Sequence, residues 1–156
     1  MNRFFAVSAA LLLAACGFHL KGTQPYDRLP VEKWRIVGDL QQPIGTALHR
    51  AGGGASDSAD VMLRVSAETK KDAYTITRAA QLNEYLLLLN VEAQAYRDGK
   101  PWGAPMSLQI RRTIPYSDSM VLGKQEEEAT IWREMREDAA EQLVRRLPFL
   151  PAADPQ

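Results

Sequence analysis

The sequence predicts an α+β fold, a two-layer sandwich in which two helices pack on one face of a four-stranded sheet. Three patterns carry this prediction. Apolar and polar residues alternate over 61–67, as in a half-buried strand, and apolar residues recur every three or four positions over 129–147, as in an amphipathic helix. The dipeptide Asp98-Gly99 separates two further strand-like segments. The order strand, helix, three strands, helix favours two layers around one core.

The size and charge of the chain narrow the classes of protein to which it can belong. Its 156 residues are 46% apolar and 24% charged, which is the profile of a single globular domain. The 19 Lys and Arg residues balance 19 Asp and Glu residues, so the bulk charge does not favour a nucleic-acid partner. The single cysteine excludes an intramolecular disulfide and a CxxC pair.

Residues 1–15 have the parts of a secretory signal peptide: the basic Arg3, an apolar run over 4–13 and two small residues. The apolar run is much shorter than the roughly 20 residues of a membrane-spanning helix. The segment Leu13-Ala14-Ala15-Cys16 resembles the lipobox of bacterial lipoproteins, whose cysteine becomes the acylated first residue after cleavage. We therefore expect removal of 1–15 and a lipid anchor, such as palmitate, on Cys16. The alternative is a free thiol in a leader that is cut further along.

The mature chain is expected to have three parts. Segment 16–30 contains Gly, Pro and polar residues and suits a lipidated tether. A single domain follows over 31–148. The small and proline-rich residues of 149–156 indicate a flexible tail.

The first half of the domain begins with a strand over 31–37, which Pro30 precedes. A short helix over 43–51 has Pro43 in its first turn and an apolar stripe at helical spacing. Residues 52–60, which are rich in Gly, Ala, Ser and Asp, form a loop.

The next segments alternate between strands and turns. A strand over 61–67 leads to a polar turn at 70–73, a β-prone stretch at 74–77 and a polar connection at 78–82. A long strand over 85–96 starts as an apolar run, which indicates burial on both faces, and ends in alternation.

A hairpin and a long helix complete the domain. The Asp98-Gly99 turn leads to a fourth strand over 106–110, which Pro115 ends. Three glutamates at 126–128 mark the start of the last helix, and Arg145 and Arg146 mark its end, so both termini suit the helix dipole. Pro148 then stops the helix.

Few residues suggest a catalytic or metal-binding site. The two histidines, His19 and His49, have no neighbouring cysteine or clustered carboxylates, so neither a metal site nor a His-based catalytic pair is expected. No nucleophile elbow, dinucleotide-binding or P-loop pattern occurs. The adjacent glutamates 126–128 point in different directions on a helix. We expect a binding or scaffolding protein rather than an enzyme, with no cofactor.

Three stretches together resemble the LptE family of lipopolysaccharide-assembly lipoproteins. They are Cys16-Gly17-Phe18-His19-Leu20-Lys21-Gly22, the Glu84-Tyr85 pair at the start of the long strand, and REMREDAAEQLVRRLP over 133–148. The resemblance implies two helices on a four-stranded sheet and an outer-membrane lipoprotein anchored on the periplasmic side. It also implies a plug inside the LptD β-barrel that binds lipopolysaccharide during its assembly at the cell surface.

The resemblance further implies two lipopolysaccharide-binding residues. The arginine before the Glu-Tyr strand matches Arg78, and the lysine before the acidic start of the last helix matches Lys124. Cations on loops at one end of a sheet suit the phosphates of lipid A. This chain departs from the family at 79–80, where Ala-Ala replaces a polar turn with Gly. The alternative is that both are solvated loop charges.

A plug needs a surface that complements a polar barrel lumen. Segment 111–116 and the outer faces of the helices are candidates for that contact. Two other functions stay open: a free-standing outer-membrane lipoprotein that binds another amphiphile or peptidoglycan, and a lipid-anchored hydrolase whose nucleophile and base meet only in the fold.

Overall fold

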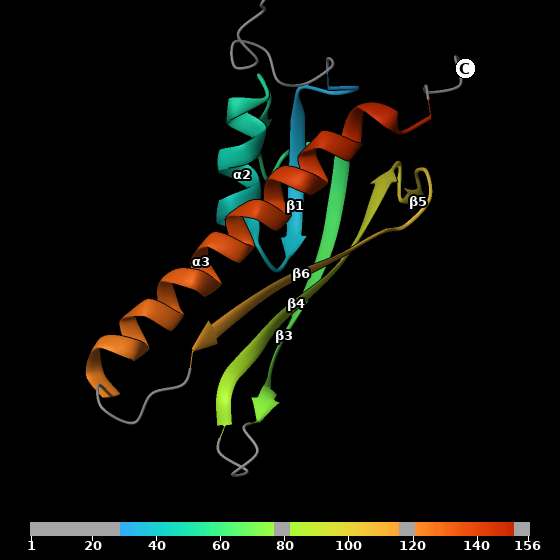
Figure 1. The fold of residues 1–156 in the computed structure, drawn as a ribbon. Coiled ribbons are helices and arrows are strands. Elements are labelled where there is room, and N and C mark those ends of the chain that lie inside the picture. The colour runs from blue at the N-terminus through green and yellow to red at the C-terminus, as the bar shows by residue number, and fades with distance from the viewer. Residues whose placement is uncertain (1–28, 77–81, 116–120, 152–156) are drawn as a thin grey trace, which may run out of the picture.

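The computed structural model describes residues 29–76, 82–115 and 121–151 and shows a mixed sheet with two helices on one face (Figure 1). In chain order the elements are β1 (Lys33–Gly38), α2 (Gln41–Arg50), β2 (Gly54–Ala55), β3 (Val61–Ile76), β4 (Leu82–Arg97), β5 (Lys100–Pro101), β6 (Met106–Pro115), α3 (Val121–Arg146) and a 3-10 turn (Leu147–Phe149). The predicted α+β class with two helices is confirmed.

The sheet has six strands among the described residues, where the sequence predicted four. β1, β3, β4 and β6 lie side by side in that order, with β1 parallel to β3 and the other two pairs antiparallel. The two additional strands are two-residue pairings, β2 with β1 and β5 with β4. β2 lies within the predicted loop 52–60. A two-residue strand leaves no hydrophobic period in a sequence, so the prediction missed both.

β3 and β4 form an antiparallel ribbon of 16 residues on each strand. The predicted polar turn at 70–73 is wrong, because β3 continues through it. Lys70 pairs with Leu88 and Lys71 with Leu87. The apolar run of β4 provides the buried surface on this stretch, so polar residues of β3 enter the sheet against their local turn preference.

The core lies between the sheet and the helices. Alternate residues of β3 and β4, including Leu63 and Leu87, are fully buried, as the alternation over 61–67 predicted. α2 and α3 contact one another and add their apolar stripes from the other side (Figure 1). These helical core residues are Ile44, Ala47, Leu48, Met135, Ala139, Ala140, Leu143 and Val144. Trp34 and Trp102 stack with ring centroids 5.8 Å apart and close the core at one end.

α3 begins at Val121, five residues before the predicted start, so Glu126, Glu127 and Glu128 do not lie in its first turn. Its end agrees with the prediction, with Arg145 and Arg146 in the last turn. The chain stays packed beyond 148: Leu150 contacts the core, and Trp102 Nε1 donates a hydrogen bond to the Pro151 carbonyl oxygen at 2.9 Å. None of the described helices is long and apolar enough to cross a membrane.

Gly38 ends β1 in a conformation that only glycine adopts without strain. Its φ is +98°, and an added Cβ would overlap the carbonyl oxygen of Val65 on β3. We predict that Gly38→Ala lowers the free energy of unfolding by at least about 2 kcal/mol, because backbone strain and a steric clash add. Gly54→Ala is the control, since its Cβ meets no atom within 4 Å. Equal denaturation midpoints for the two variants would contradict this.

Candidate functional site

The residues singled out by the sequence fall largely outside the described parts of the chain. Cys16 and Arg78 lie outside the described residues, and Arg78 belongs to the connection between β3 and β4. Lys124 lies in the first turn of α3, which begins earlier than predicted, and its side chain is also outside the description. The structure therefore locates the two strands that flank Arg78 and the helical turn that contains Lys124.

The elements that flank Arg78 and Lys124 gather at one end of the molecule, here called the tip. β3 ends there beside the start of β4, with Ile76 paired to Leu82, and β6 ends there with Pro115 paired to Glu84. The start of α3 lies at the same end, whereas the described chain begins and ends at the opposite end (Figure 1). Segments distant in sequence thus share the tip.

A cluster that we call the clasp joins β3 to α3 on the side of the tip. Lys71 Nζ lies 2.6 Å from Glu128 Oε2 and 4.3 Å from the ring centroid of Tyr85. Trp132 Nε1 donates to Glu128 Oε1 at 3.2 Å. No pattern in the sequence predicts this cluster, because the segment that contains Lys71 has a turn-like composition. Continuation of β3 turns odd-numbered residues toward α3, which brings Lys71 to Glu128.

The clasp sets the protonation of its carboxylate. The hydrogen bond from Lys71 lowers the pKa of Glu128, and the bond from Trp132 and the charge of Lys71 act in the same direction, against the opposing effect of burial. A bonded ammonium favours the ionised carboxylate. Glu128 therefore stays charged at pH values where an ordinary glutamate begins to take up a proton.

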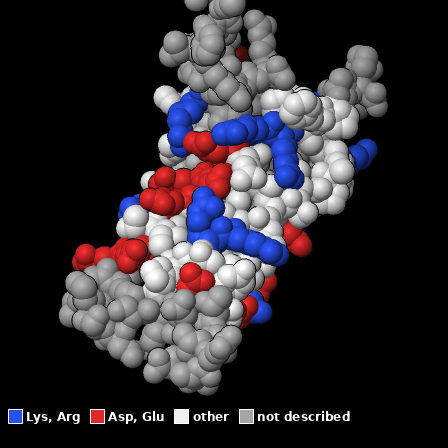
Figure 2. Space-filling model, in the orientation of Figure 1, with Lys and Arg blue, Asp and Glu red and all other residues white. Residues whose placement is uncertain are grey.

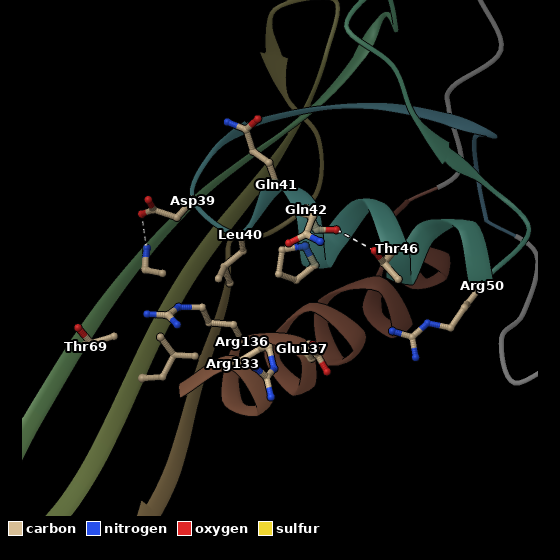
Figure 3. A pocket seen from close by; sticks show the side chains of 13 residues that line it. Asp39, Leu40, Gln41, Gln42, Thr46, Arg50, Thr69, Arg133, Arg136 and Glu137 are labelled. Carbon is tan, nitrogen blue, oxygen red and sulfur yellow. Dashed lines mark hydrogen bonds between the residues drawn. The ribbon is translucent and has the colours of Figure 1, made fainter. Parts of the chain in front are cut away.

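A cavity of about 730 Å³ lies between α2, α3 and the middle of β3, and is here called the groove. Its lining residues shown in Figure 3 come from three directions: Asp39 and Thr69 on the strand side, Gln42, Thr46 and Arg50 on α2, and Arg133, Arg136 and Glu137 on α3. Asp39 Oδ2 accepts a hydrogen bond from the Ala67 amide at 2.8 Å. Arg50 is paired with Glu141. The groove lies where β1 ends, and no local sequence pattern predicts that end.

The surface over α3 carries charges of both signs. Figure 2 shows acidic and basic side chains in alternating clusters along this face rather than a field of one sign. The two arginines of the predicted barrel-contact segment point to opposite sides of β6. Arg112 faces α3, with its Nη2 atom 3.7 Å from Asp138 Oδ2. On the other side, Arg111 Nε donates a hydrogen bond to Gln109 Oε1.

Within the described ranges, no three His, Cys, Asp or Glu residues are grouped as metal ligands.

The clasp predicts a small, pH-dependent stabilisation. The pKa of Glu128 is lowered in the folded state. The ionised carboxylate therefore stabilises the folded protein at pH values above the ordinary glutamate pKa of about 4.3, and this stabilisation is lost as the pH falls through the lowered pKa. We predict that Glu128→Gln lowers the free energy of unfolding by up to about 1 kcal/mol at pH 7, because the ion pair of Glu128 with Lys71 is partly exposed. The cost should shrink toward zero in the acid range.

Urea unfolding of the wild type and Glu128→Gln between pH 7 and pH 3 measures this difference. Glu127→Gln, one position away on an exposed site, is the matched control and should change little at any pH. A cost of Glu128→Gln that stays constant across the pH range would refute the role of its ionised carboxylate.

Comparisons with known proteins place this chain in a family. Residues 29–147 match LptE, a family described as lipopolysaccharide-assembly. A protein of Pectobacterium atrosepticum named LPS-assembly lipoprotein LptE is 33% identical over 152 residues, which cover 89% of this chain and 80% of the relative. Its namesake from Photorhabdus laumondii is 30% identical, with 95% of this chain and 85% of the relative covered.

Solved structures share the fold. A crystal structure of a minor lipoprotein from Acinetobacter baumannii matches with a TM-score of 0.66 at 24% identity, covering 84% of this chain and 100% of that chain. A solution structure of a lipoprotein B from Nitrosomonas europaea matches with a TM-score of 0.64 at 21% identity, covering 84% and 90%. The match over residues 29–147 and the identity to the Pectobacterium protein together show that this chain belongs to the LptE family of lipopolysaccharide-assembly lipoproteins.

Proposed function

We propose that this protein is an outer-membrane lipoprotein that plugs an LptD β-barrel and binds lipopolysaccharide during its assembly at the cell surface. Family membership supports the assembly role. The proposed contribution is binding and scaffolding rather than catalysis, and it involves three parts of the chain: the ribbon of β3 and β4, the tip, and the anchor on Cys16.

The observation that carries the plug proposal is the length of the ribbon together with its polar surface. Sixteen residues per strand, at about 3.3 Å each, extend over about 50 Å, more than the roughly 30 Å hydrocarbon core of a bilayer. The sheet face away from the helices carries exposed polar side chains, among them Arg64, Glu68 and Lys70. A long polar ribbon suits the wet and polar lumen of a barrel.

The tip is the proposed lipopolysaccharide site. The connection that contains Arg78 and the first turn of α3 that contains Lys124 both belong to this end of the molecule. Guanidinium and ammonium groups form charge-assisted hydrogen bonds with phosphates such as those of lipid A. Two cations on separate elements at one end of the sheet would hold an anionic headgroup from two sides.

The anchor is proposed at the opposite end of the domain from the tip. Cys16 precedes Leu29, the first described residue, by 13 positions, and the described chain begins at the end remote from the tip (Figure 1). Several acyl chains on Cys16 would give stable attachment, which one chain does not. The tether 16–30 would then connect the periplasmic side of the outer membrane to the domain.

Affinity purification tests the plug proposal. A C-terminally tagged copy, solubilised in detergent from the outer membrane, should recover a large β-barrel protein at close to one-to-one stoichiometry, as mass spectrometry and gel densitometry would show. Recovery of the lipoprotein alone would contradict the proposal. It would favour the free-standing module that binds another amphiphile or peptidoglycan.

Charge reversal tests the tip. We predict that Arg78→Glu and Lys124→Glu each weaken the binding of purified lipopolysaccharide by about tenfold or more, because each removes a charge-assisted bond and adds repulsion. Arg35→Glu, an exposed arginine of β1, is the control and should bind as the wild type does. Recovery of the barrel should stay unchanged in both tip variants. Wild-type lipopolysaccharide affinity in both tip variants would exclude this site.

A further inference from the structure

β3 has a free edge next to the groove. β1 pairs with β3 only from Met62 to Val65 and then ends, while β3 continues to Ile76. Asp39 extends the contact by one step: its amide donates to the Val65 carbonyl oxygen at 2.9 Å, and its carboxylate accepts from the Ala67 amide. Beyond Ala67, no described strand pairs with β3 on this side.

The backbone groups along this edge have a defined direction. The Ala67 amide points to the β1 side, and the regular register with β4 extends to Ala73, so every second residue repeats that direction. Thr69, Lys71 and Ala73 therefore present their amide and carbonyl groups outward, and we call these three residues the open edge. Their neighbours at 68, 70 and 72 bond β4 instead.

At the opposite edge of the sheet, arginine side chains bind two of the outward carbonyl groups, and the open edge has no such bonds among the described residues. On β6, the Ser107 carbonyl oxygen accepts from Arg146 Nη1 at 2.9 Å, and the Arg111 carbonyl oxygen accepts from Arg112 Nη1 at 3.1 Å. Proteins commonly shield edge strands with such charged side chains. Lys71 does not shield the open edge, because the clasp holds its side chain toward Glu128.

We propose that the open edge receives an extended segment of the barrel partner, which adds to β3 as a further strand in the place that β1 leaves. The inference rests on the proposed plug function and specifies one of its contacts. Strand addition satisfies unpaired backbone groups with a ladder of hydrogen bonds, and the adjoining groove holds the side chains of the added strand. The groove has a volume of about 730 Å³ and is lined by Thr69 of the open edge.

One residue of the groove, Arg136, indicates which kind of side chain the added strand carries opposite it. Arg136 lines the groove, is half-buried, and has no hydrogen-bond or ion-pair partner within the described ranges. A carboxylate on the added segment would pair with this guanidinium in a charge-assisted bond. The occupant is thus an extended segment with an acidic residue facing Arg136.

Amide hydrogen exchange with residue resolution tests strand addition, with the full lipidated chain in detergent alone and in complex with the barrel. In the chain alone, amides 68, 70 and 72 should exchange slowly and those of the open edge rapidly. In the complex, exchange at Thr69, Lys71 and Ala73 should slow by about tenfold or more. The even-numbered amides of β3 are an internal control.

Two substitutions give a second readout. Thr69→Pro removes an outward amide without removing a bond to β4 and should speed dissociation of the barrel by about threefold to tenfold. Thr69→Val, which keeps the amide, is its control. Arg136→Glu should speed dissociation by about tenfold, and Arg136→Lys, which keeps the positive charge, is its control and should speed dissociation much less.

The outcomes separate this inference from the plug proposal. A complex in which the open edge exchanges as fast as in the chain alone would overturn strand addition and leave the plug proposal standing. Failure of the barrel to bind at all would overturn both. Protection of the same amides by purified lipopolysaccharide without the barrel would assign the groove to the lipid and also overturn strand addition.

Discussion

Antiparallel pairing of β3 with β4, from Val61 opposite Arg97 to Ile76 opposite Leu82, is the constraint on which the rest of the molecule depends. β1 adds to one side of this ribbon and β6 to the other, and α2 and α3 bury its inward residues. Because β1 is much shorter than β3, the ribbon is covered unevenly. The first half of β3 is packed into the core. Its second half extends toward the tip with one edge open, while Leu87 and Leu89 of β4 stay buried opposite it.

This uneven cover explains where the molecule can bind. In the first half, Leu63 and Val65 of β3 and Val91 of β4 belong to the core shared with α2 and α3, which makes a rigid platform. In the second half, the clasp connects β3 to α3 through charged and aromatic groups rather than through a dry core. The groove, the open edge and the tip all lie beyond the end of β1. Binding surfaces thus occur where apolar packing ends, beside a scaffold that holds them in place.

The sequence predicted the elements correctly where a hydrophobic period extends over many residues. The alternation from Val61 to Val65 and the apolar stripe of α3 predicted both the elements and their buried faces. The prediction failed where tertiary pairing decided the outcome: residues 70–73 have the composition of a turn, yet the leucines of β4 hold them in a strand. The clasp and the groove depend on residues about 30 to 100 positions apart, such as Asp39 with Ala67 and Arg136, which no local pattern connects. The family resemblance named Arg78 and Lys124, whose side chains lie outside the described residues, so they stay predictions.

Site-specific photocrosslinking in intact cells is the most direct test of a ribbon that fills a barrel along its length. Arg64, Glu68 and Tyr74 are exposed on the same face of β3, and the first and last are separated by about 33 Å along the strand. A photoreactive phenylalanine at each position should crosslink to lumen-facing residues of one barrel, at heights that follow the order of the three positions. Crosslinks to the barrel from one position only, or to unrelated envelope proteins from all three, would contradict the account.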